Sequence, residues 1–157
     1  MNLIKTLFVC TGNTCRSPFA AVALTDFLKK HYPQQEDYFS VKSAGIYARE
    51  GRPASTLALE VAREYHLDLS IHKSTALTSS SVRASHVILT MTQEHLNCLK
   101  DQFSAPSNKT FLMSQWLDGK EILDPFSGNE DTYTQVFEYI LLCIPSIAAY
   151  LLRLMET

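Results

Sequence analysis

The sequence has no excess of charge of either sign and no long uninterrupted apolar run. Its 157 residues carry 14 Lys and Arg against 16 Asp and Glu, a formal net charge of -2. Binding to nucleic acid or to an anionic membrane needs concentrated positive charge, so neither partner is expected. The most apolar stretch, residues 140–154, is interrupted by Pro145 and falls short of membrane-spanning length. A membrane partner is therefore not expected from hydropathy either.

Other missing features narrow the class of protein further. There is no internal repeat, no low-complexity tract and no linker, so we expect one domain over residues 1–157. The first ten residues lack an apolar segment followed by a small-residue cleavage site, which favours a cytoplasmic protein. In a reducing cytosol, the 4 cysteines are expected to be free, catalytic or redox-active rather than a disulfide framework.

Apolar runs of strand type alternate with amphipathic helical patterns along the chain. Strands are predicted at residues 5–10, 38–46, 85–91 and 109–113, and helices at 17–32, 54–67, 92–103 and from 129–132 onward. Ser17 with Pro18 is expected to start the first helix, Thr92 to cap the third, and Pro145 to kink the last without ending it. The alternation predicts an α/β three-layer sandwich, with a four-stranded parallel sheet and helices on both faces. Sites in such sheets lie beyond the carboxyl ends of the strands.

The residues Cys10-Thr-Gly-Asn-Thr-Cys-Arg-Ser17 connect the first predicted strand to the first helix. A loop of this length can turn its backbone N–H groups inward and bind an anion, helped by the positive end of the helix dipole. Gly12 and Asn13 tolerate the left-handed backbone that such a curl needs. Arg16 adds a planar fork for two phosphate oxygens, and Cys10 should be a thiolate in this positive environment. The loop therefore predicts a nucleophilic sulfur beneath a bound phosphoryl group.

Three other interpretations of this loop explain fewer of its residues. A Walker-type nucleotide loop needs a Gly-Lys-Ser/Thr ending, which is absent. A zinc site needs further ligands at ligand spacing, but only Cys98, Cys143 and scattered histidines remain. Two cysteines packed in a core would leave Arg16 without a role. We therefore expect neither a metal nor a cofactor.

Four motifs together resemble the low-molecular-weight protein tyrosine phosphatase family. They are VCTGNTCRSP at residues 9–18, KSAG at 42–45, ILTMT at 88–92 and LDPF at 123–126. The likeness extends over essentially the whole chain, in order. It implies a cysteine-dependent phosphatase of α/β architecture, with the phosphate-binding loop directly after the first strand. It also implies phosphorylated protein substrates, and we expect a monomer.

The resemblance assigns a role to each residue of the phosphate loop. Cys10 would be the nucleophile, and Arg16 would bind the phosphate. The Ser17 hydroxyl would hydrogen-bond the thiolate, while Asn13 with Ser43 and His72 would brace the loop from behind. The remaining phosphate oxygens would be bound by the backbone amides of Thr11, Gly12, Asn13, Thr14, Cys15 and Arg16.

Asp124 matches the residue that, in the family, protonates the leaving group. It precedes Pro125 in a loop before the last helix, and it would later act as the base for the attacking water. Without the family match, an Asp-Pro turn on the surface would be the simpler interpretation. Asp118 and Asp131 are alternative candidates for the acid.

Two positions depart from the tyrosine-directed pattern of the family. Thr14 stands where tyrosine-specific members commonly carry a bulky apolar residue, and Phe126 stands where many carry tyrosine. With the MTxxH stretch at residues 91–95, these positions resemble the bacterial protein-arginine phosphatase branch. A threonine at the rim suits a polar, planar guanidinium better than a phenol. We therefore favour phosphoarginine over phosphotyrosine, although Phe126 and Trp116 would still be available for an aromatic slot.

Several alternatives stay open at this point. An arsenate reductase shares the fold and the Cys-x5-Arg loop, but the second of its two relay cysteines is missing near Cys98. A non-catalytic module that binds phosphorylated partners would not need the complete catalytic set. Cys15 either forms a reversible, protective disulfide with Cys10 or packs beneath the helix start. The histidines other than His72, including His95, are expected at solvated ends of helices or strands.

Overall fold

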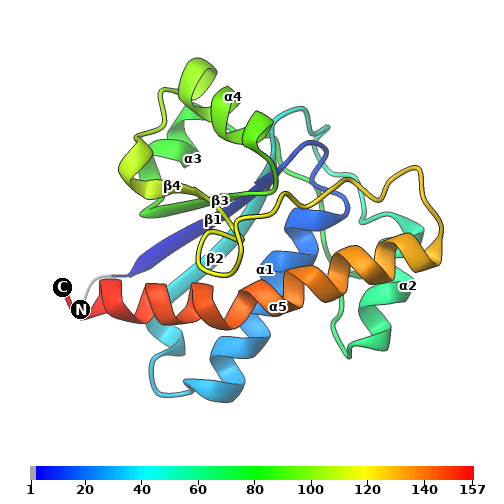
Figure 1. Cartoon of the computed structure of the whole chain (residues 1–157), viewed down its shortest axis with the longest axis horizontal. Coiled ribbons are helices and arrows are strands. Elements are labelled where there is room, and N and C mark those ends of the chain that lie inside the picture. Colours follow the sequence, from blue (N-terminus) through cyan, green and yellow to red (C-terminus); the bar gives the residue numbers. More distant parts are fainter. Residues whose placement is uncertain (1–2) are drawn as a thin grey trace.

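The computed structural model describes residues 3–157. All four strands are parallel and lie in the order β2-β1-β3-β4, which places β1 at the centre of the sheet (Figure 1). The strands are β1 Ile4–Cys10, β2 Phe39–Gly45, β3 Val87–Thr90 and β4 Thr110–Leu112. The helices are α1 Arg16–His31, α2 Thr56–Glu64, α3 Ser79–Ala84, α4 Gln93–Phe103 and α5 Glu130–Met155, with 3-10 turns η1 Glu36–Tyr38 and η2 Ser107–Lys109.

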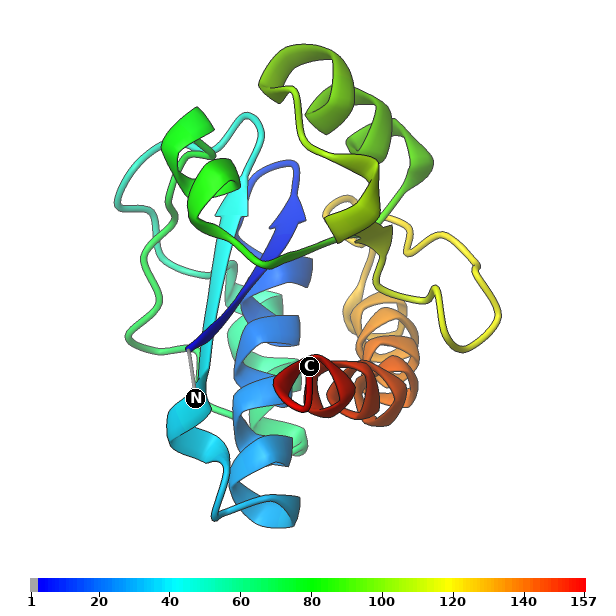
Figure 2. The same cartoon turned by 90° about the vertical axis from the view of Figure 1, so that its left-hand side faces the viewer.

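Side chains of β1 alternate between two separate apolar cores. Phe8 points into the larger core, which α1, α2 and α5 cover, whereas Leu7 and Val9 point into a smaller core with α3 and α4. Figure 2 shows α1 and α5 on one side of the sheet and α3 and α4 on the other. A strand buried on both faces must be apolar throughout, which is why residues 7–10 read as one continuous apolar run. The predicted three-layer fold is confirmed.

The start of α1 differs from the expectation, whereas the start of α4 agrees with it. Cys15 occupies the N-cap position of α1, and Ser17 lies inside the first turn, so the prediction of Ser17 as the cap was wrong. The physical reason is that its hydroxyl contacts the Cys10 sulfur instead of a helix amide. Thr92 caps α4 as predicted and forms a capping box with His95.

Helix α5 begins where it was predicted and is apolar over much of its length. It runs for 26 residues through Pro145 without a break, with a mean hydropathy of 1.7 over its most apolar window. Length and composition alone would therefore permit it to cross a membrane, contrary to the expectation. In this fold it packs along α1 and α2, and one face of it is buried in the larger core. The buried residues of this face include Phe137, Ile140, Ile144, Ile147 and Leu151.

Lys109 joins η2 to the carboxyl end of α3. Its ammonium group donates hydrogen bonds to the carbonyl oxygens of Val82 at 2.8 Å and Ser85 at 2.7 Å. These carbonyls lack partners within the short helix, so the lysine supplies them. Partial burial of the ammonium group lowers the pKa of Lys109.

Replacing Lys109 by Met should therefore destabilise the fold by about 1–3 kcal/mol, because buried carbonyls lose a charged donor. Thermal unfolding followed by circular dichroism measures the change. Lys100→Met, at an exposed position of the neighbouring helix α4, is the matched control and should change stability by less than about 0.5 kcal/mol. Equal losses in the two variants would contradict the capping role.

Candidate active site

A pocket of about 180 Å³ lies at the carboxyl end of β1. Strand β1 ends at Cys10 and α1 begins at Arg16, so the loop between them curls at the centre of the sheet edge. The segment preceding α5 passes over the same edge (Figure 1). The pocket is lined by Cys10, Thr11, Gly12, Asn13, Thr14, Cys15, Arg16, Asp124 and Phe126. The structure thus brings together the predicted loop and two residues more than 100 positions away in sequence.

Asn13 is fully buried and connects the loop to three other segments. Its Oδ1 accepts from the backbone N–H of Thr75 at 2.9 Å, which fixes the orientation of the side-chain amide. Its Nδ2 therefore donates to Ser17 Oγ at 2.8 Å and to Ser43 Oγ at 3.0 Å. The Nε2–H of His72 donates to the backbone carbonyl oxygen of Asn13 at 2.7 Å. Asn13, Ser43 and His72 thus meet in one hydrogen-bond network behind the loop.

Two hydrogen-bond donors converge on the sulfur of Cys10. Ser17 Oγ lies 2.9 Å from Cys10 Sγ, and the backbone N–H of Asn13 points to the same sulfur at 3.3 Å. Because Ser17 Oγ already accepts from the Asn13 amide, its own proton is free to point toward the sulfur. This arrangement suits a sulfur that carries negative charge.

The left-handed residue of the loop is Asn13 alone. Its φ is 57°, whereas Gly12 has no positive φ, so of the two residues that tolerate the left-handed backbone only Asn13 adopts it. The glycine that the loop needs is Gly45, at the end of β2 beside Cys10. A Cβ there would lie 2.7 Å from the Thr11 carbonyl oxygen and 2.9 Å from the Asn13 nitrogen. The motif match at residues 42–45 contained this glycine, but its packing role was not foreseen.

Cys15 is a free thiol, as is Cys10, and faces a buried hydroxyl cluster. Its sulfur lies 3.3 Å from Ser55 Oγ and 3.4 Å from Tyr133 Oη, and these two oxygens are 3.2 Å apart. Burial raises the pKa of Tyr133 to about 12, so the phenol stays neutral. Tyr133 thus supports the loop from below and does not line the pocket.

Arg16 is buried beneath the pocket and is held by the segment that carries Asp124. Its Nη1 donates to the Ile122 carbonyl oxygen at 2.7 Å, and its Nη2 lies 3.7 Å from Asp124 Oδ2. Asp124 Oδ1 accepts from the backbone N–H of Phe126 at 3.0 Å, a local turn that orients the carboxyl group. The Asp124 side chain is 52% exposed, in contrast to 4% for Arg16. The carboxyl group therefore stands at the mouth and the guanidinium at the base.

Of the three aspartates considered as the general acid, only Asp124 lines the pocket. Asp118 accepts hydrogen bonds from Tyr139 Oη and from the backbone N–H of Lys120, and it does not line the pocket. Asp131 lies exposed in the first turn of α5. Trp116 stacks on Tyr150 with 4.3 Å between ring centroids, so the expectation that it would help form an aromatic slot was wrong.

His95 is a site residue that the sequence argument missed. It was expected to be solvated, but it is only 5% exposed and its Nε2 lies 2.9 Å from Thr11 Oγ1. The sequence contained a signal for this position, because His95 stands three residues after the helix cap Thr92, where a capping box places the side chain beside the cap. That position turns the side chain back toward the end of the sheet, where the pocket lies.

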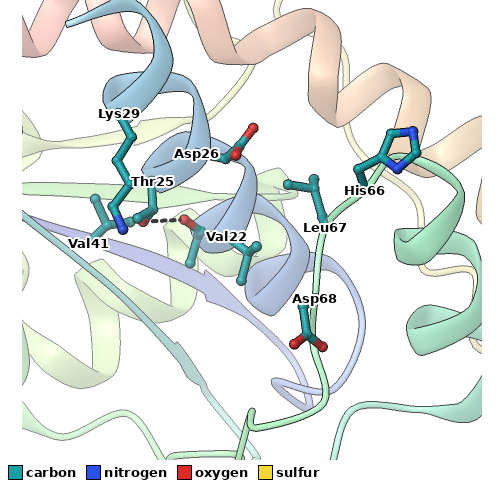
Figure 3. A pocket seen from close by; sticks show the side chains of 9 residues that line it. Val22, Thr25, Asp26, Lys29, Val41, His66, Leu67 and Asp68 are labelled. Atoms are coloured by element: carbon teal, nitrogen blue, oxygen red, sulfur yellow. Dashed lines mark hydrogen bonds between the residues drawn. The ribbon is translucent and has the colours of Figure 1, made fainter. Parts of the chain in front are cut away.

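A larger groove, of about 320 Å³, runs along the body of α1 (Figure 3). It lies between α1, Val41 of β2 and the segment after α2, and it shares no residue with the loop pocket. Charged side chains of both signs line it, namely Asp26, Lys29 and Asp68. It offers no nucleophile and no concentration of one charge. The chemistry of the residues, and not the size of the hollow, identifies the candidate site.

Comparison with known proteins places this arrangement in one family. The family model described as low molecular weight phosphotyrosine protein phosphatase matches residues 5–153. The chain belongs to this family. It is 36% identical to a protein-arginine-phosphatase of Bacillus subtilis, over 82% of this chain and 84% of that one. It is 35% identical to the low molecular weight protein-tyrosine-phosphatase Etp of Escherichia coli K12, over 83% of both.

A solved structure of the arginine phosphatase YwlE superimposes with a TM-score of 0.84 at 31% identity, covering 94% of this chain and 95% of that one. That structure is of a variant in which a serine replaces a cysteine, and its active-site serine is phosphorylated. The chain is therefore a low-molecular-weight protein phosphatase, a hydrolase. Relatives of the two substrate classes match it almost equally well, so overall identity does not choose between phosphoarginine and phosphotyrosine.

Gly45→Ala should displace the phosphate loop, because two of the atoms that its Cβ would meet within 3 Å are backbone atoms of that loop. We expect a loss of about 1–3 kcal/mol in stability and a clear fall in kcat, measured by thermal unfolding and steady-state hydrolysis of an aryl phosphate. Gly51→Ala is the control, since its Cβ would meet nothing within 4 Å. It should cost about 1 kcal/mol through its positive φ and leave kcat unchanged. Unchanged kcat in both variants would show that Gly45 does not set the loop position.

Proposed function

We propose that the chain hydrolyses phosphoarginine in proteins through a phosphocysteine intermediate at Cys10. The observation that supports this reaction is the pocket itself, which is lined by a buried sulfur with two hydrogen-bond donors, by the buried Arg16 and by the half-exposed Asp124. The phosphorylated active-site serine of the YwlE variant supports a covalent intermediate in a relative. Cys15, the other free thiol that lines this pocket, is engaged with Ser55 Oγ at 3.3 Å and Tyr133 Oη at 3.4 Å.

The reaction consists of two in-line displacements. The Cys10 thiolate attacks phosphorus, the bond from phosphorus to the substrate nitrogen or oxygen breaks, and Asp124 gives its proton to the leaving group. Water then attacks the phosphocysteine, Asp124 takes a proton from that water, and the thiolate leaves while Ser17 donates a hydrogen bond to it. Loop amides and Arg16 stabilise the charge on the transferring phosphoryl group in both steps.

Thr14 is the residue on which the preference for phosphoarginine rests. It lines the pocket, and it offers a hydroxyl and a small side chain where a bulky apolar group would suit a phenol. Phe126, which is 71% exposed, also lines the pocket and contributes an apolar surface to it. Phosphotyrosine is the alternative substrate, supported by the similar identity to the tyrosine phosphatase Etp.

Two other functions find less support. An arsenate reductase would need relay thiols that can reach Cys10, but Cys143 is buried in α5, where burial raises its pKa to about 12. Cys98 lies on α4 and does not line the pocket. A non-catalytic binding module would leave Asp124 without a role at the mouth.

Phosphate release from matched phosphoarginine and phosphotyrosine peptides tests the substrate. We expect phosphoarginine to be preferred by the wild type, and the preference to collapse in Thr14→Ile. Cys10→Ser should abolish turnover while it still binds inorganic phosphate, which separates loss of chemistry from loss of fold. A phosphotyrosine preference in both wild type and Thr14→Ile would overturn the substrate assignment. Turnover by Cys10→Ser close to that of the wild type would overturn the mechanism.

Asp124→Asn should lower kcat by about 10²–10⁴-fold for a substrate with a poorly acidic leaving group. In the first displacement, followed as the burst of released leaving group, the loss should be much smaller for nitrophenyl phosphate, because nitrophenolate leaves without a proton. Asp118→Asn and Asp131→Asn are matched controls with the same change of charge outside the pocket, and both should keep the wild-type kcat. An equal loss of burst rate for both leaving groups would contradict the acid role of Asp124.

A further inference from the structure

The phosphate loop is held by two different sets of contacts. The Asn13 network fixes the middle of the loop and the start of α1. None of these hydrogen bonds reaches Thr11, the residue that follows Cys10. Thr11 is held instead through its carbonyl oxygen, which accepts from the Tyr47 backbone N–H at 2.9 Å, and through its hydroxyl group, which hydrogen-bonds to His95.

The hydrogen bonds of His95 determine which of its ring nitrogens carries the proton. The backbone N–H of Thr92 points to His95 Nδ1 at 3.3 Å, and a backbone N–H can only donate. Nδ1 is therefore the acceptor, and the proton of the neutral ring is on Nε2. The Nε2–H then donates to Thr11 Oγ1 at 2.9 Å. One histidine thus caps α4 with one nitrogen and holds the phosphate loop with the other.

The surroundings keep this ring neutral. Burial and then the nearby Arg16 guanidinium lower the pKa of His95 to about 4, while Asp124 and Glu121 act in the opposite direction. A protonated ring would place an N–H against the Thr92 N–H, and it would add a second positive charge beside Arg16. The contact to Thr11 is therefore available in a single tautomer throughout the neutral pH range.

We propose that His95 is a positioning residue that fixes Thr11, and with it the amides next to the nucleophile, relative to Cys10. This proposal rests on the proposed function, because it assumes that the reaction takes place at Cys10. The contact connects the amino end of α4 to the reacting centre across the sheet edge. Its effect is on the placement of the loop around the phosphoryl group, and His95 itself does not line the pocket.

Two substitutions separate the two contacts of His95. In His95→Asn, the short amide reproduces the Nδ1 position and keeps the cap of α4, but it does not reach Thr11. In His95→Gln, the longer amide places an N–H donor near the Nε2 position. Thr11→Val removes the acceptor at nearly constant shape. His86→Asn is the matched control, since the Nδ1 of His86 also accepts from a backbone N–H, that of Lys5 at 2.9 Å, far from the loop.

Hydrolysis of an aryl phosphate and inhibition by inorganic phosphate are measured for each variant. We expect His95→Asn and Thr11→Val each to lower kcat by about tenfold and to weaken phosphate binding, with no further loss in the double variant. His95→Gln should recover most of the activity, His86→Asn should match the wild type, and the thermal midpoint of His95→Asn should stay near that of the wild type. Losses that multiply in the double variant, or no recovery with Gln, would overturn the proposal.

A spectroscopic measurement tests the contact without any turnover. The ring ¹⁵N signals of His95 should report the Nε2–H tautomer at neutral pH and a pKa about two units or more below that of a solvated histidine. Thr11→Val should shift the Nε2 signal and leave the Nδ1 signal in place. A normal pKa, or signals unaffected by Thr11→Val, would overturn the proposed contact. These results do not depend on the substrate, so a failure of the phosphoarginine assignment stays distinguishable from a failure of this proposal.

Discussion

The architecture of the site depends on the buried, left-handed Asn13. A residue in this conformation at the centre of a fold is stable only when its polar groups are fully paired. Here its side-chain amide and carbonyl bond to the start of α1, to β2 and to the segment after α2. The shape of the loop therefore depends on the packing of these segments, and a bound phosphate would meet amides that are already oriented. This preorganisation is what a charge-stabilising phosphatase loop requires.

A second constraint joins Arg16 to the segment that carries Asp124. Ile122 donates its N–H to the Met91 carbonyl oxygen at 2.8 Å, at the end of β3, and accepts from Arg16 through its own carbonyl oxygen. The position of the Arg16 guanidinium at the base of the pocket is thus fixed by the end of β3 through the buried residue Ile122. Asp124, only two residues further on, is half exposed. The site has a rigid base and an open mouth, which suits a substrate that is the side chain of another protein.

The sequence predicted the four strands and the helices α1, α2, α4 and α5, because apolar periodicity is a local signal. It missed α3, whose six residues are too few to show that periodicity. It also identified the loop chemistry, since Cys10 and Arg16 are fixed by a short spacing between a strand and a helix. It failed for Ser17 as a cap, since the hydroxyl bonds to a sulfur that a helix pattern does not reveal. The sequence also misplaced Trp116, which packs on Tyr150, and His95, which contacts Thr11. An aromatic ring or an imidazole has no local signature that tells whether it packs, lies in solvent or supports a site.

The sequence by itself determined the fold class and singled out Cys10 and Arg16 as the proposed nucleophile and phosphate-binding residue, because these follow from patterns within a few residues of one another. Only the tertiary structure decided which aspartate reaches the pocket, which glycine lies against the loop and which histidine holds Thr11. Those partners are far apart along the chain, 84 residues for Thr11 with His95 and 106 for Arg16 with Ile122. Their meeting results from the packing of β1 between its neighbours, which brings the carboxyl ends of the strands to one edge.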